Sequence, residues 1–397
     1  MLRVCSYKKS PKITNFNGTH DRNNMQISKY ILSISIPSLI FLAGCDKVKE
    51  LQNSITPSSV PTVISKKLDF QTTENTGKMV INPQFDAAEN FLDGLAVVKI
   101  GNNYGFIDKQ GKFVINPQFD FALNFSEGLA PVRIGGVRTG KAGYIDKQGK
   151  IVINQLFNNA GSFSEGLAVT SIDNKSGYID KQGKFVINPQ FDAAYNFKEG
   201  LGGVRIGNDR TGKYGYIDKQ GKMVINPQFD LTIGFSEGLA GVRIGDQKSS
   251  KWGFIDKQGN IVISPQFFLV SSFSEGLAKV MIGFKWGFID KQGKFVINPQ
   301  FYDAQEFSDG LAGVKIGEKW GFIDKQGKFV INPQFDFARP FSEGLAVVAI
   351  GDKHGYMDKQ GKIVINPQFD DAQEFSEGLA IITIGDQFTG KRGYIRR

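Results

Sequence analysis

The stretch "KWGFIDKQGKFVINPQF" (Lys285–Phe301) recurs with small changes from residue 78 to residue 397. The first glycine of this stretch measures the period, and successive copies of it are 34 or 38 residues apart. These glycines are Gly105, Gly143, Gly177, Gly215, Gly253, Gly287, Gly321, Gly355 and Gly393. Two spacings that differ by four residues indicate one repeating unit with one optional insertion.

Each unit is expected to contain three short strands, which in one copy are Leu95–Gly101, Tyr104–Asp108 and Lys112–Phe119. Apolar residues occupy both alternating faces of the first strand, so both faces need cover. A turn that ends in glycine joins the second strand to the third. The next segment, Phe119–Gly128, has apolar residues spaced by three and is expected to form one helical turn.

A single unit cannot bury two apolar faces, so each copy needs its neighbours. The sequence therefore predicts an all-β array of about nine three-stranded units over residues 78–397. We expect an elongated, curved, superhelical stack, and a closed propeller-like ring is the alternative. The stack is favoured because propeller blades typically have four strands over about forty or more residues.

The N-terminal region is typical of an exported protein. Residues 1–44 form a lead and a signal peptide, whose apolar run follows Lys29, and Met25 is a candidate start. Leu42-Ala43-Gly44-Cys45 resembles the lipobox of bacterial lipoproteins, and this resemblance implies that Cys45 carries the lipid. Residues 45–77 are polar and are expected to form a flexible tether. The predicted location is the cell envelope, anchored to a bacterial membrane on the exported side.

Charge and composition argue against several classes of function. The formal net charge is +9, but residues 1–44 hold six Lys and Arg against one Asp, and the rest of the chain has no basic run. Nucleic-acid binding is therefore not expected. Both cysteines, Cys5 and Cys45, precede the repeats, which excludes a thiolate metal cluster there. We expect no metal and no cofactor.

Tryptophan precedes the period glycine in three copies, at Trp252, Trp286 and Trp320. Together with "FIDKQGKFVINPQFD" and "FSEGLA", these pairs resemble the WG (KWG) repeat family of bacterial proteins. The resemblance covers about 320 of the 397 residues. It implies repeats used for binding or scaffolding, with no defined chemistry. The tryptophan stripe is expected to be core between units, with sugar stacking as the alternative.

No catalytic residues are expected. His354 is the one histidine of the repeats, and it occupies the slot that Trp fills in other copies, which favours packing. The repeated Asp and Glu residues are identical copies in turns, whereas a glycosidase needs one pair in distinct environments. The protein is therefore predicted not to be an enzyme.

The optional insertions all fall in the turn between the first two strands of a unit, and such insertions often mark a binding face. The candidate binding hairpins contain Arg138, Lys141, Arg210, Lys213, Lys248, Lys251, Lys391 and Arg392. We expect an exported, lipid-anchored repeat protein that binds a protein or peptide partner in the envelope. The alternative partner is a cell-wall polysaccharide.

Overall fold

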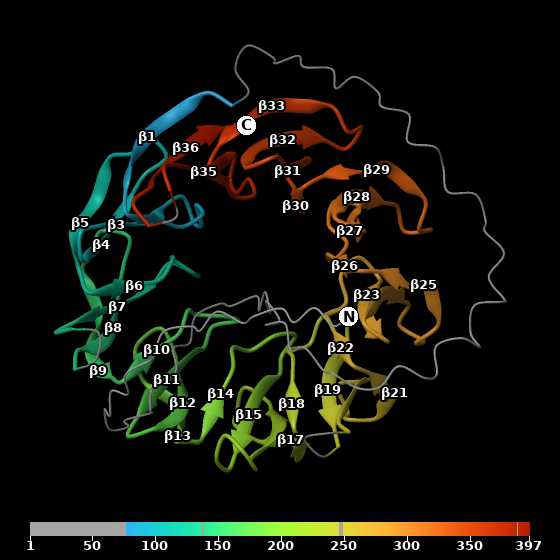
Figure 1. Cartoon of the computed structure of the whole chain (residues 1–397). Helices are drawn as coiled ribbons and strands as arrows, with labels where there is room; N and C mark the ends of the chain where they lie inside the picture. The colour runs from blue at the N-terminus through green and yellow to red at the C-terminus, as the bar shows by residue number, and fades with distance from the viewer. Residues whose placement is uncertain (1–76, 137–138, 246–248, 387) are drawn as a thin grey trace, which may run out of the picture. The chain divides into compact units, whose positions relative to one another are not determined.

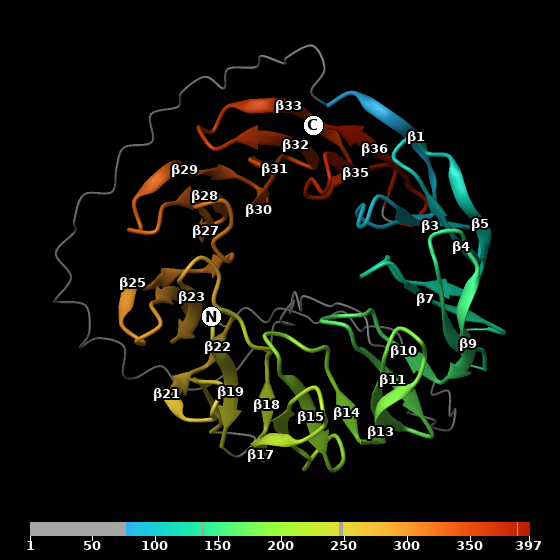
Figure 2. The same ribbon diagram turned by 180° about the vertical axis from the view of Figure 1, so that it is seen from behind.

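A computed structural model describes residues 77–136, 139–245, 249–386 and 388–397. Over these residues the chain forms nine four-stranded antiparallel sheets, which follow one another around a ring (Figure 1). Figure 2 shows the same succession from behind. Each sheet is one blade of a β-propeller, so the expected all-β repeat class is confirmed.

The ring closes through its last blade. Here β1 (Met79–Phe85) pairs with β36 (Lys391–Arg396), which lies about 300 residues later in the chain. Met79 pairs with Ile395, and Ile81 pairs with Tyr394. The expectation of an elongated open stack is therefore wrong, and the closed ring, which was the alternative, is confirmed. Nine blades complete one full turn, so the last blade meets the first strand.

The two inner strands of each blade follow the corner between blades. The innermost strands are β2 (Ala87–Ala88), β6 (Phe121–Ala122), β10 (Asn159–Ala160), β14 (Ala193–Ala194), β18 (Leu231–Thr232), β22 (Leu269–Val270), β26 (Asp303–Ala304), β30 (Phe337–Ser342) and β34 (Asp371–Ala372). The second strands are β3 (Ala96–Ile100), β7 (Ala130–Ile134), β11 (Ala168–Ile172), β15 (Gly202–Ile206), β19 (Ala240–Ile244), β23 (Ala278–Ile282), β27 (Ala312–Ile316), β31 (Leu345–Ile350) and β35 (Leu379–Ile384).

The two outer strands carry the repeated stretch. The third strands are β4 (Asn103–Ile107), β8 (Lys141–Ile145), β12 (Lys175–Ile179), β16 (Lys213–Ile217), β20 (Lys251–Ile255), β24 (Lys285–Ile289), β28 (Lys319–Ile323), β32 (Lys353–Asp358) and β36. The outermost strands are β5 (Phe113–Phe119), β9 (Ile151–Phe157), β13 (Phe185–Phe191), β17 (Met223–Phe229), β21 (Ile261–Phe267), β25 (Phe295–Phe301), β29 (Phe329–Phe335), β33 (Ile363–Phe369) and β1.

The expected helical turn at residues 119–128 is a strand and a tight turn instead. The N–H of Asp120 donates to the carbonyl oxygen of Arg133, and the N–H of Leu123 donates to that of Pro131. The segment therefore pairs with the next strand rather than with itself. The apolar residues spaced by three do not share a helix. Phe119 ends the outermost strand, Ala122 ends β6, and Phe125 is buried beyond β6.

The hydrophobic core lies between adjacent blades. Trp286, Phe288 and Ile297 of one blade pack in the same cluster as Phe307 and Val314 of the next. Equivalent clusters occur around the ring, including one that joins the strands of the closing blade to the first blade. Each blade therefore buries its apolar faces against two neighbours, as the repeat required.

The glycine before the aromatic residue of each third strand, such as Gly287 before Phe288, is required for steric reasons. Pairing of β24 with β25 shifts register between Trp286 and Phe288, which marks a bulge or irregularity of the ladder. A Cβ atom on Gly287 would lie 2.6 Å from the carbonyl oxygen of Ile297 and 2.6 Å from the nitrogen of Pro299. No other residue fits this close approach without moving backbone.

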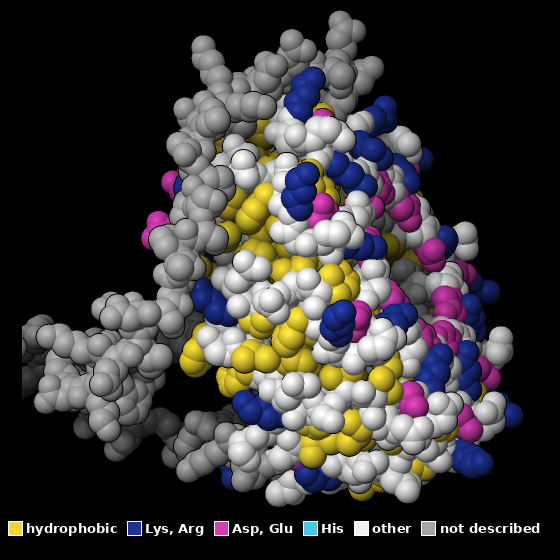
Figure 3. Space-filling model, turned by 90° about the vertical axis from the view of Figure 1, so that its right-hand side faces the viewer, with side chains coloured by type: hydrophobic (Ala, Val, Ile, Leu, Met, Phe, Trp, Pro, Cys, Tyr) yellow, Lys and Arg dark blue, Asp and Glu magenta, His cyan; other side chains and the backbone are white. Residues whose placement is uncertain are grey.

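The rim of the ring is apolar in patches. Each outermost strand buries its third residue, an isoleucine, and its last residue, a phenylalanine. The second residue, a valine, is exposed in most copies, as at Val296 and Val330. Figure 3 shows hydrophobic side chains spread over this rim and charged side chains gathered along one edge of the ring.

Candidate binding face

The two faces of the ring carry different loops. Because neighbouring strands of a blade are antiparallel, the loops after the first and third strands lie on one face. The hairpins between the second and third strands lie on the opposite face, together with the corners that lead to the next blade. We call the first face the clamp face and the second the hairpin face.

On the clamp face, an acidic side chain of each described blade accepts a hydrogen bond from a glycine N–H of the next blade. Glu199 accepts from Gly238 at 3.0 Å, and Glu377 of the closing blade accepts from Gly94 of the first blade at 3.2 Å. All of these acids have a positive φ between 52° and 57°. They are Asp93, Glu127, Glu165, Glu199, Glu237, Glu275, Asp309, Glu343 and Glu377.

A lysine from the turn after the third strand reaches the same carboxylate. Nζ of Lys257 lies 3.1 Å from Oε2 of Glu199. Burial is the largest single influence and raises the pKa of Glu199, but the hydrogen bonds from Lys257 and Gly238 and the charge of Lys257 together lower this pKa below its usual value. The same balance lowers the pKa of Glu127 and Glu237. The acidic side chains of the clamp face, and the lysines that pair with them, therefore hold neighbouring blades together.

The turn after the third strand is split in the closing blade. The N–H of Gly77 donates to the carbonyl oxygen of Arg396 at 2.8 Å, and the N–H of Arg396 donates to that of Lys78 at 2.9 Å. In the other blades a continuous Asp-Lys-Gln-Gly-Lys or Asp-Lys-Gln-Gly-Asn turn makes the same two backbone bonds. Two distant segments of the chain therefore rebuild one turn.

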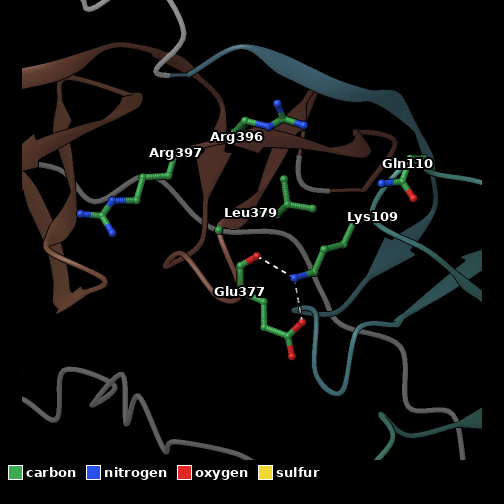
Figure 4. Close-up of a pocket in the computed structure, with 7 residues that line it drawn as sticks. Lys109, Gln110, Glu377, Leu379, Arg396 and Arg397 are labelled. Carbon is green, nitrogen blue, oxygen red and sulfur yellow. Dashed lines mark hydrogen bonds and ion pairs between the residues drawn. The ribbon is translucent and has the colours of Figure 1, made fainter.

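An open pocket of about 540 Å³ lies beside the split turn. Nζ of Lys109 lies 3.0 Å from Oε2 of Glu377 and also donates to the backbone oxygen of Glu377 (Figure 4). The side chains of Arg396 and Arg397 point away from each other in this view. The pocket therefore lacks convergent free groups. Its lining residues are Lys109, Gln110, Glu377, Gly378, Leu379, Arg396 and Arg397.

On the hairpin face, three of the candidate binding lysines make contacts across the corner to the next blade. Nζ of Lys213 lies 2.5 Å from Oδ1 of Asp230, and Nζ of Lys141 lies 3.2 Å from Oδ1 of Asn158. Lys391 forms an ion pair with Asp86. The hydrogen bond from Lys391 is the main reason why the pKa of Asp86 is lowered. These lysines contribute to the ring itself.

The other candidate hairpin residues lie in different settings. Arg210 is exposed, and a guanidinium nitrogen of Arg392 donates to the backbone oxygen of Asp86. Lys251 is exposed at the start of β20. Arg138, Lys248 and the expected lipid-attachment residue Cys45 lie outside the described residues.

The tryptophan stripe lies between blades. Trp252 and Trp286 are 9% exposed, and Trp320 is 7% exposed. Nζ of Lys279 lies 4.8 Å from the ring centre of Trp286. The rings are therefore not presented to solvent as a stacking platform.

Four exposed aromatic side chains on the hairpin face were not among the expected site residues: Phe388, which is 92% exposed, and three that lie between residues 268 and 302. Phe268 is 52% exposed, Phe284 76% and Tyr302 60%. The ring centres of Phe268 and Phe284 are 6.1 Å apart. Nζ of Lys285 lies 3.0 Å from the ring centre of Tyr302. Aligning the copies would have revealed two of them, because Phe268 and Tyr302 stand where most copies have Asp.

The described residues contain no group of three or more His, Cys, Asp or Glu side chains that could hold a metal ion. In the same part of the chain, no helix has the length and apolarity needed to span a membrane.

A model of the WG-containing repeat matches the chain nine times between residues 75 and 388. The matches are to residues 75–104, 104–137, 143–175, 177–208, 214–247, 252–285, 286–320, 320–353 and 355–388. No curated protein sequence matches the chain significantly.

Several solved structures resemble the chain distantly. The biofilm matrix protein Bap1 of V. cholerae is 10% identical, with a TM-score of 0.34, over 83% of this chain and 90% of that one. The tricorn protease is 11% identical, with a TM-score of 0.28, over 80% of this chain and 39% of that one. The extracellular domain of a hybrid two-component system from B. thetaiotaomicron is 11% identical, with a TM-score of 0.27, over 79% of this chain and 51% of that one. The chain thus spans about half or less of the last two, and similarity at this level says nothing about function.

Proposed function

Since the chain belongs to the WG-containing repeat family, we propose that it is a non-enzymatic binding protein whose hairpin face docks a protein or peptide partner in the cell envelope. One observation carries this proposal: the copies agree on the clamp face and differ on the hairpin face. Asp-Lys-Gln-Gly is identical in eight turns, and an acid followed by glycine occurs in all nine copies. The hairpins have two lengths, and the corner residue is Asp in six copies but Asn158, Phe268 or Tyr302 in the others.

The two faces differ in what their side chains already do. Each clamp carboxylate is bonded to the next blade, so a change there weakens the ring. Hairpin tips such as that of Arg210 project into solvent from paired strands and are free to differ. Variable loops on a rigid scaffold are a common basis for recognition.

Site-specific photo-crosslinking in intact cells tests the choice of face. A benzophenone amino acid replaces Arg210 on the hairpin face or, as the matched control, the exposed Gln148 on the clamp face. We expect protein adducts from position 210 and none from position 148. Adducts from position 148 alone would contradict the proposal. Crosslinking to polysaccharide instead of protein would favour the cell-wall alternative.

We also propose that the ring is tethered to a bacterial membrane through a lipid on Cys45. The support is the lipobox-like Leu42-Ala43-Gly44-Cys45 after an apolar run. Cys45→Ala is expected to abolish both incorporation of labelled palmitate and sedimentation with membranes. Cys5→Ala is the control and should change neither. If the Cys45 variant still sediments with membranes, the anchor proposal fails.

A further inference from the structure

We propose that Phe268, Phe284 and Tyr302, together with Lys251, form a subsite for a peptide segment that presents an apolar side chain beside a carboxylate. The inference rests on the proposed function in placing the partner on the hairpin face. It goes further in naming the blades and the chemistry of the bound segment.

The subsite lies where two successive corners depart from the repeat. At most corners a lysine that begins the third strand contacts a polar residue 17 positions later, as Lys319 contacts Asp336 at 2.5 Å. At the subsite the corresponding residues are Phe268, which follows Lys251, and Tyr302, which follows Lys285. Two lysines therefore lose their usual carboxylate in adjacent blades.

The position of Lys251 follows from the strand register. Trp252 pairs with Phe267, so Lys251 and Phe268 occupy the next rung of the same ladder. Lys251 makes no ion pair with another described residue, whereas Lys285 lies over the ring of Tyr302. Lys251 thus lies on the rung beside the exposed Phe268 and has no carboxylate partner among the described residues.

Phe284 occupies a backbone position that disfavours it. It has a φ of 63° in the hairpin between β23 and β24. The left-handed region is unusual for a bulky residue, and strain of this kind is often found at ligand-binding positions. In another hairpin of the same length the residue with a φ of 62° is Asn174. Despite the strain, Phe284 is 76% exposed, so burial in the ring does not compensate for it.

The geometry favours a peptide over a sugar. The planes of Phe268 and Phe284 are inclined by 55°, so they do not form a flat platform. One face of Tyr302 is already covered by Lys285. Phenylalanine offers no polar atom to a sugar hydroxyl, whereas a ligand site usually fixes hydroxyls with several polar groups. An apolar side chain fits between inclined rings, and a neighbouring carboxylate complements Lys251.

Fluorescence anisotropy with defined peptides tests the subsite on the purified full chain. The probe is a labelled heptapeptide, Gly-Ser-Asp-Phe-Asp-Ser-Gly. Two matched probes replace its Phe by Ser or both Asp by Lys, and unlabelled chitohexaose serves as a competitor. We expect the first probe to bind about tenfold or more tightly than either matched probe, because both apolar contact and charge contribute. We expect chitohexaose not to displace it.

Three variants separate binding from folding. Phe268→Asp restores the repeat residue beside Lys251, and Phe284→Asn introduces the residue that another hairpin uses. Both should weaken binding of the first probe about tenfold while the melting temperature stays equal or rises, since an exposed aromatic is lost and strain is relieved. Phe388→Asn removes a 92% exposed aromatic from a different hairpin and should leave binding unchanged.

Specific outcomes would overturn the inference. These are unchanged binding by Phe268→Asp, equal binding of the Ser or Lys probe, and displacement by chitohexaose. If crosslinking from position 210 still yields protein adducts in any of these cases, the subsite fails while the hairpin-face proposal stands. If crosslinking is confined to position 148, the proposed function fails independently of the peptide result.

Discussion

At the scale of single residues, the period glycine carries the strongest steric constraint. Gly287→Ala places a methyl group within 2.6 Å of backbone atoms of the neighbouring strand. We expect a loss of about 1–3 kcal/mol in the free energy of unfolding, because the strand must move to accept it. Urea denaturation followed by circular dichroism measures this loss.

Gly161→Ala is the matched control for that experiment. Its nearest contact with a new Cβ would be 3.5 Å, to the carbonyl oxygen of Val169, which is ordinary van der Waals contact. It should change stability little. Equal effects of the two substitutions would show that the different backbone preferences of glycine and alanine, rather than the close approach, account for the loss.

The sequence showed that the period glycines recur at a regular spacing, but it did not show why each of these positions requires glycine. Their role depends on the bulge that brings the outermost strand against the third strand, and a bulge is a feature of pairing. In the same way, Phe284 could not be singled out, because its backbone conformation is set by the hairpin. Phe268 and Tyr302 could have been found from the sequence as replacements of a repeated Asp.

At the scale of elements, the closing strand β1 should be as important as any internal outermost strand. Ile81 of β1 is 3% exposed, and Ile297 of β25 is 4% exposed. Both lie against the turn glycine of the next blade, Gly111 and Gly327 respectively. Ile81→Ala and Ile297→Ala are therefore expected to cost similar amounts, about 2–5 kcal/mol each. Thermal unfolding of the two variants measures both costs.

An open array would give a different result for this pair of variants. Its first strand would be a fraying end with one neighbour, so Ile81→Ala would cost far less than Ile297→Ala. The three longer strands of the unit were predictable from their apolar alternation and turn glycines. The innermost strand was missed because it has two residues in eight of the nine described blades, too few to establish a period.

At the scale of the whole molecule, the missed fourth strand decided the choice of shape. Counting three strands per unit favoured an open stack, whereas four strands per unit is the pattern of a propeller blade. The division of the last blade between both ends of the repeat region was visible in the sequence. Its consequence for closure depended on the fit of nine blades into one turn, which no single unit specifies.

The ring should lose stability in acid. The pKa values of Glu127, Glu199 and Glu237 are lowered from 4.5, because the lysine and glycine donors together outweigh the effect of burial. A carboxylate with a lowered pKa in the folded state stabilises the protein above its unfolded pKa, and this contribution is lost as the pH falls through the folded value. We expect the melting temperature to fall steadily between about pH 5 and pH 3.

Glu199→Gln provides the control for the acid experiment. The amide can still accept from Gly238 but cannot titrate, so the variant should start less stable and show a shallower decline. A melting temperature that is constant or rises towards pH 3 would contradict the role of the clamp carboxylates.

The split turn of the closing blade constrains the order in which the molecule folds. β1 is among the first strands to be synthesised, and its partner β36 is the last. Until β36 has been synthesised, β1 has no strand to pair with, and the ring cannot close. Folding therefore ends with a long-range closure step, which is slow because the chain between the two strands must first be ordered. Before closure, the apolar side chains that the first and last blades bury against each other are exposed, so aggregation is expected to compete with folding at this stage.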